Sequence, residues 1–487
     1  LIKNSNSATV VAGHRNIIMG RKAAQGVLTG DRNIFLGQYS GCAATTACCN
    51  IALGTHALGN ATLTGDNNVV LGQCAGKGAT SAEKNILIGK DTASAATLTG
   101  DNNIFMGEQA GDNTTSGANN IGMGKLALGS GTLTGANNIA LGQNAGRDIA
   151  GGVYNVFFGE HAGCKATTSE SSIAIGREAL GFGPLTGNHN IAMGCRAGCE
   201  MTSGEHNIIM GFQAGSYQAI TANDNILMGR YAGVNMTSAT GNIGMGCLAL
   251  ASAVNTGADN IALGSMAGRN ITSGANNIAI GKMAGCAVAA CGENVFVGYY
   301  AGKTTTGIAN VFLGKDAGST VTSGCYNIAL GRDALGDGAG TTGNSNIAMG
   351  YSSGEKMTSG NNNFFAGYFA GGSVTTGANN VVFGNTAGKN VGAGENNVFI
   401  GENAGKSSGT AADNNASDNI AIGKDSGLAL TTGSNNVFLG HGAGETETDG
   451  NSHIFIGYRA GRCRAGNGSI AIGNQALVGL STQASNT

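Results

Sequence analysis

Proline and tryptophan are almost missing from this chain, which contains one proline and no tryptophan in 487 residues. Glycine is abundant, with 87 residues, but it does not return at every third position. A collagen-like chain needs that spacing and a Pro/Gly linker needs proline, so both classes are excluded. The helix formers Glu, Lys and Gln are sparse while Gly, Asn and Thr abound, so we expect almost no α-helix.

Charge and long apolar runs are scarce as well. The chain has 26 basic and 28 acidic residues, a near balance that argues against a nucleic acid as the partner. No apolar run reaches the roughly 18 residues of a membrane-spanning helix, so we expect no membrane insertion. The first residues, Leu1-Ile2-Lys3, do not begin a signal-peptide pattern.

A short phrase returns 27 times between Asn16 and Leu477, mostly every 17 or 18 residues. It consists of Asn (position 0), a β-branched residue (+1), a small or aromatic residue (+2), an aliphatic residue (+3), Gly (+4), two variable residues, and Ala-Gly or Ala-Leu. Such a period is typical of a solenoid, in which each repeat buries its apolar face against its neighbours. We therefore predict an all-β β-solenoid (β-roll) of about 27 repeats, forming one elongated domain over residues 1–487.

The predicted repeats run from about residue 13 to residue 480. Solenoids need their open ends covered, and neither end of the sequence resembles a folded cap. We therefore expect this chain to be a segment of a longer polypeptide, or to dock at its ends onto another protein.

Two positions of the repeat are nearly invariant. Gly occupies +4 in all 27 copies, among them Gly142, Gly281 and Gly384, which predicts a positive φ or no room for a Cβ. Asn occupies position 0 in 24 copies, among them Asn138, Asn277 and Asn380. It could form a turn in the left-handed region, or a ladder of stacked amides. We favour the ladder, because a turn alone would also admit Asp and Gly.

Positions +1 to +3 form a continuous apolar run, which is typical of a strand covered on both faces. We expect +1 and +3 to point into the coil and +2 to point outward. A row of phenylalanines at +2 would then need a cover, and a second copy of the chain is the simplest one. This row comprises Phe35, Phe105, Phe157, Phe296, Phe312, Phe399, Phe438 and Phe455.

The chain has twelve cysteines and seven histidines, the residue types that could form disulfides, bind a metal or take part in catalysis. Cys42 with Cys48, and Cys286 with Cys291, are close enough in sequence to form disulfides within single connectors, which would indicate an oxidising compartment. The alternative is that they are small, half-buried thiols. No Cys-x-x-Cys pair is present, and the histidines fall in different registers. We expect no enzyme activity, no metal and no cofactor.

The repeat resembles the head repeat of trimeric autotransporter adhesins, and is more similar still to repeats of bacteriophage tail fibres and related bacterial surface fibres. Ser171-Ser172-Ile173-Ala174-Ile175-Gly176 matches the former, and Thr375-Thr376-Gly377-Ala378-Asn379-Asn380 matches the approach to the strand in the latter. The resemblance covers nearly the whole chain. It implies a parallel homotrimer with binding at the tip or on side loops. The chain differs from the adhesins in its longer repeat and has no recognisable anchor, coiled-coil stalk or autoproteolytic chaperone.

The expected function is thus the structural shaft of a phage tail fibre on the virion surface. Its partners would be two further copies of itself, an anchoring protein of the tail or cell surface, and a host surface receptor such as a glycan. A bacterial surface adhesin or extracellular filament subunit is the alternative. A single-chain, acyltransferase-like left-handed β-helix would explain the six-residue spacing of Ile121, Ala127, Leu133 and Ile139. An ice-binding solenoid would explain Thr-x-Thr pairs such as Thr62 and Thr64.

Overall fold

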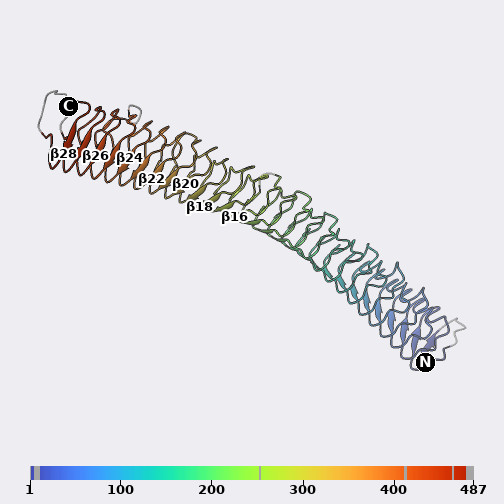
Figure 1. Ribbon diagram of the computed structural model, residues 1–487. Coiled ribbons are helices and arrows are strands. Elements are labelled where there is room, and N and C mark those ends of the chain that lie inside the picture. The colour runs from blue at the N-terminus through green and yellow to red at the C-terminus, as the bar shows by residue number, and fades with distance from the viewer. Residues whose placement is uncertain (1, 5–10, 252–253, 411–413, 463–465, 479–487) are drawn as a thin grey trace. The chain divides into compact units, whose positions relative to one another are not determined.

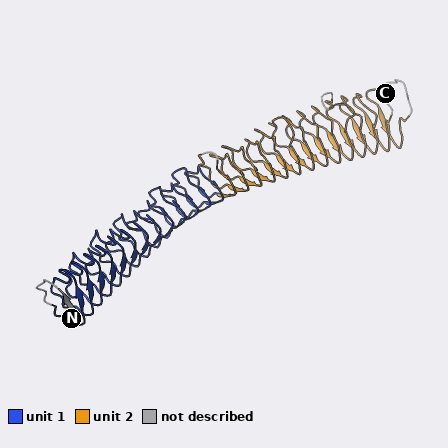
Figure 2. Ribbon diagram, turned by 180° about the vertical axis from the view of Figure 1, so that it is seen from behind, with its two compact units in different colours: residues 1–242 blue, residues 243–487 orange. Residues whose placement is uncertain are grey.

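The computed structural model describes residues 2–4, 11–251, 254–410, 414–462 and 466–478 (Figure 1). The chain is an all-β parallel β-solenoid, and its described residues contain strands and turns but no helix. It divides into two compact units, residues 1–242 and 243–487 (Figure 2). Both units have the same architecture, with one short strand in each turn.

Each strand is three residues long and, from β2 onward, occupies positions +1 to +3 of the repeat. In unit 1 the strands are β1 (Ile2–Asn4), β2 (Ile17–Met19), β3 (Ile34–Leu36), β4 (Ile51–Leu53), β5 (Val69–Leu71), β6 (Ile86–Ile88), β7 (Ile104–Met106), β8 (Ile121–Met123), β9 (Ile139–Leu141), β10 (Val156–Phe158), β11 (Ile173–Ile175), β12 (Ile191–Met193), β13 (Ile208–Met210) and β14 (Ile226–Met228). In unit 2 they are β15 (Ile243–Met245), β16 (Ile261–Leu263), β17 (Ile278–Ile280), β18 (Val295–Val297), β19 (Val311–Leu313), β20 (Ile328–Leu330), β21 (Ile347–Met349), β22 (Phe364–Ala366), β23 (Val381–Phe383), β24 (Val398–Ile400), β25 (Ile420–Ile422), β26 (Val437–Leu439), β27 (Ile454–Ile456) and β28 (Ile470–Ile472).

Strand β1 precedes the first copy of the repeated phrase and pairs in parallel with β2. The β-structure therefore starts at Ile2, ahead of residue 13, where we expected the repeats to begin. The expected end of the repeats, near residue 480, lies outside the described residues.

Within each unit, every strand pairs in parallel with its sequence neighbour, and equivalent positions face each other. Ile278, Ala279 and Ile280 of β17, for example, pair with Val295, Phe296 and Val297 of β18. The same register holds across a 22-residue step, where Val398 pairs with Ile420. Extra residues are therefore accommodated in the connectors, and the strands keep their alignment.

The prediction for the two faces of the strand was wrong. Position +2 is the buried one, and both Phe312 and Phe438 are completely inaccessible to solvent. Positions +1 and +3 point outward and, apart from the small Ala366, are half-buried or exposed. Successive side chains of a strand point to opposite sides, and the narrow coil accommodates one inward side chain per strand. The buried phenylalanines therefore do not distinguish a trimer from a single-chain solenoid.

The interior of each turn is filled by +2, by Ala at +7 and by one apolar connector residue, such as Ile271 or Met357. Position +8 adjusts the volume. Where +2 is Phe365, position +8 is Gly371, and a Cβ there would lie 2.6 Å from the phenyl ring. Where +2 is Ala52, position +8 is Leu58, which is also buried.

Candidate functional site: the amide ladder and the exposed sheet face

The asparagines at position 0 form a ladder of buried amides that runs from turn to turn, in the direction in which the strands stack. The backbone N–H of Asn277 and its Nδ2 both donate to Oδ1 of Asn260, each at 3.0 Å. Its own Oδ1 accepts the backbone N–H of Asn294 at 3.1 Å. Asn138 and Asn380 make the same contacts with the preceding asparagines, Asn120 and Asn363.

The structure also assigns the turn to a different residue. Position −1 has the left-handed backbone, with φ of 59° at Asn276, 61° at Asn137 and 59° at Asn379. The ladder continues where the repeat changes length, because Asn419 donates to Asn397 Oδ1 at 3.1 Å across 22 residues. We infer that the amides set the register of successive turns.

Glycine at +4 is required for both of the reasons that the sequence suggested. Gly142, Gly281 and Gly384 have φ of 135°, 126° and 138°, a region that L side chains rarely adopt. A Cβ at Gly281 would also lie 2.5 Å from the carbonyl oxygen of Gly298 in the next turn. These glycines thus form a second column in which neighbouring backbones approach closely.

The outward positions +1 and +3 form two parallel columns of apolar, mostly aliphatic side chains, which we call the sheet face. In unit 2, for example, Leu313 is 39% exposed, Met349 41%, Val381 40% and Phe383 56%. Sequence reasoning assigned these residues to the core, because a continuous apolar run of three residues does not show which of them points inward.

Tyrosines follow a different rule from phenylalanines. Tyr299, Tyr351 and Tyr368 lie at +5, directly after the glycine corner, and all are exposed. The rings of Tyr351 and Tyr368 stack with centroids 5.3 Å apart, and the Arg332 guanidinium lies 5.6 Å from the Tyr351 ring. Sequence analysis missed this surface row, although Tyr never occupies +2 in any repeat.

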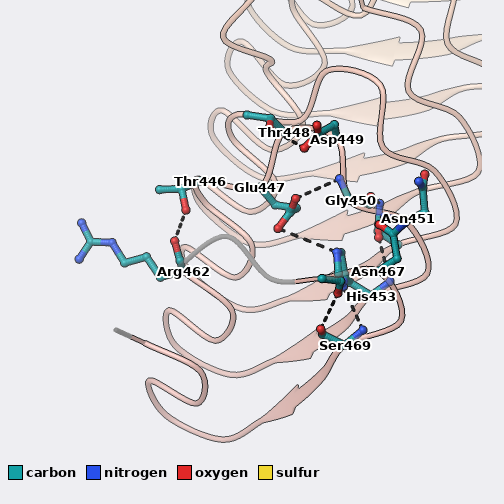
Figure 3. Close-up of polar contacts among 12 residues, drawn as sticks. Thr446, Glu447, Thr448, Asp449, Gly450, Asn451, His453, Arg462, Asn467 and Ser469 are labelled. Atoms are coloured by element: carbon teal, nitrogen blue, oxygen red, sulfur yellow. Dashed lines mark hydrogen bonds and ion pairs between the residues drawn. The ribbon is translucent and has the colours of Figure 1, made fainter. Parts of the chain in front are cut away.

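One turn of unit 2 contains a buried ionisable pair (Figure 3). His453 replaces the ladder asparagine, and Glu447 occupies the connector position that is apolar Leu430 one turn earlier. The His453 Nε2 lies 3.9 Å from Glu447 Oε2, and both side chains are 1% exposed or less. Burial lowers the pKa of the His453 imidazole below its ordinary value, and the Glu447 carboxylate opposes this shift.

The structure forms neither of the disulfides that the spacing allowed. Cys42, Cys48, Cys286 and Cys291 are free thiols. The Cys286 thiol donates to the carbonyl of Lys303 at 3.4 Å, and the Cys42 thiol contacts the equivalent carbonyl, that of Gly59, one turn on. These thiols therefore bond along the solenoid rather than across a connector. Burial raises the pKa of Cys42 and of Cys286, with nearby lysines opposing it, so both are weak nucleophiles at neutral pH.

The other ion pairs lie at the surface, such as Lys315 with Asp316 at 3.3 Å, and some share a carboxylate, as Arg147 and Lys165 share Asp148. Among the described residues, no three or more His, Cys, Asp or Glu side chains gather where they could hold a metal ion. In that same part of the chain, no helix is long and apolar enough to cross a membrane. No protein-family model matches the sequence, and no curated protein shows significant similarity to it.

Proposed function

We propose that this protein is the structural shaft of a homotrimeric phage tail fibre on the virion surface, and that it carries receptor binding away from its anchor. The observation that carries the proposal is the sheet face. Its two apolar columns recur on every strand from β2 to β28, with the small Ala366 as the one weak position. A monomer would present this face to water along each unit.

The area of the sheet face supports self-association. Monomeric proteins rarely expose apolar patches of more than roughly 300–600 Å². A standard interface takes about 800 Å² from each partner. The sheet face extends over all the strands of each unit from β2 onward, which gives it the length that such an interface needs. Further copies of the same chain match this face in length and period, and a parallel arrangement would keep equivalent turns level.

The interior supports a mechanical role. The strand pairing and the buried amide ladder connect successive turns within each unit, so neighbouring turns are held by both backbone and side-chain hydrogen bonds. Such repetition gives stiffness and resistance to proteases without a catalytic site. The exposed row at +5 provides aromatic and basic groups, which binding surfaces favour. It supports contact with a host receptor, a glycan among them, along the side of the shaft.

The same architecture would serve a bacterial surface adhesin or an extracellular filament subunit, and these remain the second candidate. They share the resemblance of the repeat and the sheet face, and differ in the anchor. The genes that neighbour the coding sequence would separate a viral from a cellular origin.

Oxidative footprinting of methionines tests the proposed interface, because the chain supplies its own controls. Met123, Met245 and Met349 lie on the sheet face and are 39–41% exposed, Met266 and Met283 lie at +6 and are half-buried, and Met201 and Met357 are in the core. After brief oxidation of the purified protein, mass spectrometry should find the sheet-face methionines as protected as the core ones, while those at +6 oxidise. Sheet-face methionines that oxidise at least as fast as Met266 and Met283 would contradict the interface.

A further inference from the structure

The step from β27 to β28 is bonded differently from the other described steps of the ladder. Elsewhere an amide or hydroxyl oxygen accepts the backbone N–H of the next turn, as Ser172 Oγ accepts Asn190 N–H at 3.3 Å. Here the acceptor is a nitrogen, because the Ser469 N–H donates to Nδ1 of His453 at 3.2 Å (Figure 3). An amide or hydroxyl oxygen accepts at any ordinary pH, whereas Nδ1 accepts only while the imidazole is neutral.

The surroundings of His453 are built around the neutral ring. Since Nδ1 accepts a hydrogen bond, the proton of the neutral imidazole is on Nε2, which faces Glu447. A Cβ at Gly450 would lie 2.1 Å from Nε2, so the glycine makes room for the ring. The ring stacks on Phe455 with centroids 4.9 Å apart. Within the described residues, Nε2 has no hydrogen-bond partner.

Glu447 is the one titratable group that faces the ring from the described residues around it. Its Oε1 accepts the Gly450 N–H at 3.0 Å, which holds the carboxylate in place. From the preceding turn the contact is Asn436, whose Oδ1 accepts the His453 N–H at 2.9 Å, and from the following turn it is Ser469. The carboxylate favours an imidazolium, but the Ser469 N–H and the burial of the ring oppose one.

We propose that His453 makes the attachment of β28 sensitive to pH, so that protonation of the ring opens the turn that follows it. Protonated Nδ1 cannot accept the Ser469 N–H, and the two N–H groups would point at each other. Opening exposes the imidazolium to water. The strand that would be released is weakly held by packing, because Ile470 and Ile472 are 62% and 68% exposed.

The direction of the effect follows from the two states of the ring. His453 in the open turn titrates near its ordinary value of 6.5, and in the closed turn its pKa is lower. The closed turn is therefore fully favoured above about pH 6.5 and loses stability as the pH falls below that value. At pH 5.5 the opening equilibrium should be up to about tenfold larger than at pH 8.

Hydrogen–deuterium exchange, corrected for intrinsic rates, tests this between pH 8 and pH 5.5. The exchange rate of the amides in Ile470–Ile472 should rise up to about tenfold. The exchange rate in the reference strand Val437–Leu439 should not change, because the ladder acceptor before that strand is the amide oxygen of Asn419. The variant His453→Asn restores the usual ladder residue and should remove the rise. Glu447→Gln removes the charge that stabilises the imidazolium in the closed turn. The pKa of His453 in the closed turn then falls further, so the rise at pH 5.5 should be at least as large as in the wild type.

Two results would overturn the inference. One is a wild-type protein whose β28 amides show no increase at pH 5.5. The other is an increase in His453→Asn as large as in the wild type, which would assign the pH effect to another group.

Discussion

A single asparagine at position 0 stabilises two neighbouring turns. Its backbone N–H and Nδ2 donate to the asparagine before it, and its Oδ1 accepts from the asparagine after it, as at Asn277. Because the side chain is buried, water cannot replace these partners. A shortened side chain therefore leaves buried donors and acceptors unsatisfied on both sides.

Replacing Asn277 by Ala should lower the opening free energy of β17 and β18 by about 1–3 kcal/mol. Asn276→Gly is the matched control, since Asn276 lies next to it and glycine tolerates its φ of 59°. Long repeat arrays need not unfold in one step, so amide exchange of the two strands is the suitable measurement. If the two variants lowered the opening free energy equally, the ladder would not be what stabilises these turns.

At the level of one turn, leucine occupies +8 only where +2 is alanine or glycine, and every phenylalanine at +2 has glycine at +8. Phe365 is accompanied by Gly371, whereas Ala52 is accompanied by Leu58. The two pairs can be compared because the turn that follows each of them has the same residues, valine at +2 and glycine at +8 (Val382 with Gly388, and Val70 with Gly76). Leu58 has a φ of 50°, so leucine adopts the left-handed backbone at +8 when the phenyl ring is absent.

Replacing the Phe365 and Gly371 pair by alanine and leucine tests this, because the effect of Gly371→Leu on stability should reverse once the phenyl ring is gone. Phe365→Ala should destabilise its turn by about 3–5 kcal/mol. Gly371→Leu should destabilise the wild type, because a Cβ there meets the ring at 2.6 Å, but should stabilise the Phe365→Ala protein. Amide exchange of β22 in the four proteins completes a double-mutant cycle. Additive effects would show that the two positions do not share one space.

The repeat period, the all-β class and the parallel one-strand turn followed from the sequence, because they depend on pattern. The inward face did not, since three successive apolar residues such as Val311-Phe312-Leu313 leave open which of them points into the coil. The sequence did contain a signal for the inward face: glycine occupies +8 wherever phenylalanine occupies +2, which indicates that the two positions share the same interior space. The contact between His453 and Glu447 could not be predicted either, because the two residues are six apart in sequence and only the fold brings their side chains to 3.9 Å.

At the scale of the molecule, the interior and exterior columns have separate roles. Phenylalanine, alanine and the connector residues fill each turn, and the amides hold successive turns in register. The aliphatic sheet face is left outside, where a soluble single chain would favour polar residues. The proposed assembly of parallel copies would cover this face, and a shaft is the function that we propose for such an assembly.

The native mass of the purified protein, measured by light scattering after size exclusion, tests this account most directly. We predict a mass three times the 48.1 kDa of one chain, unchanged on dilution and in mild denaturant. A monodisperse species of 48.1 kDa would contradict the covered sheet face and with it the fibre proposal.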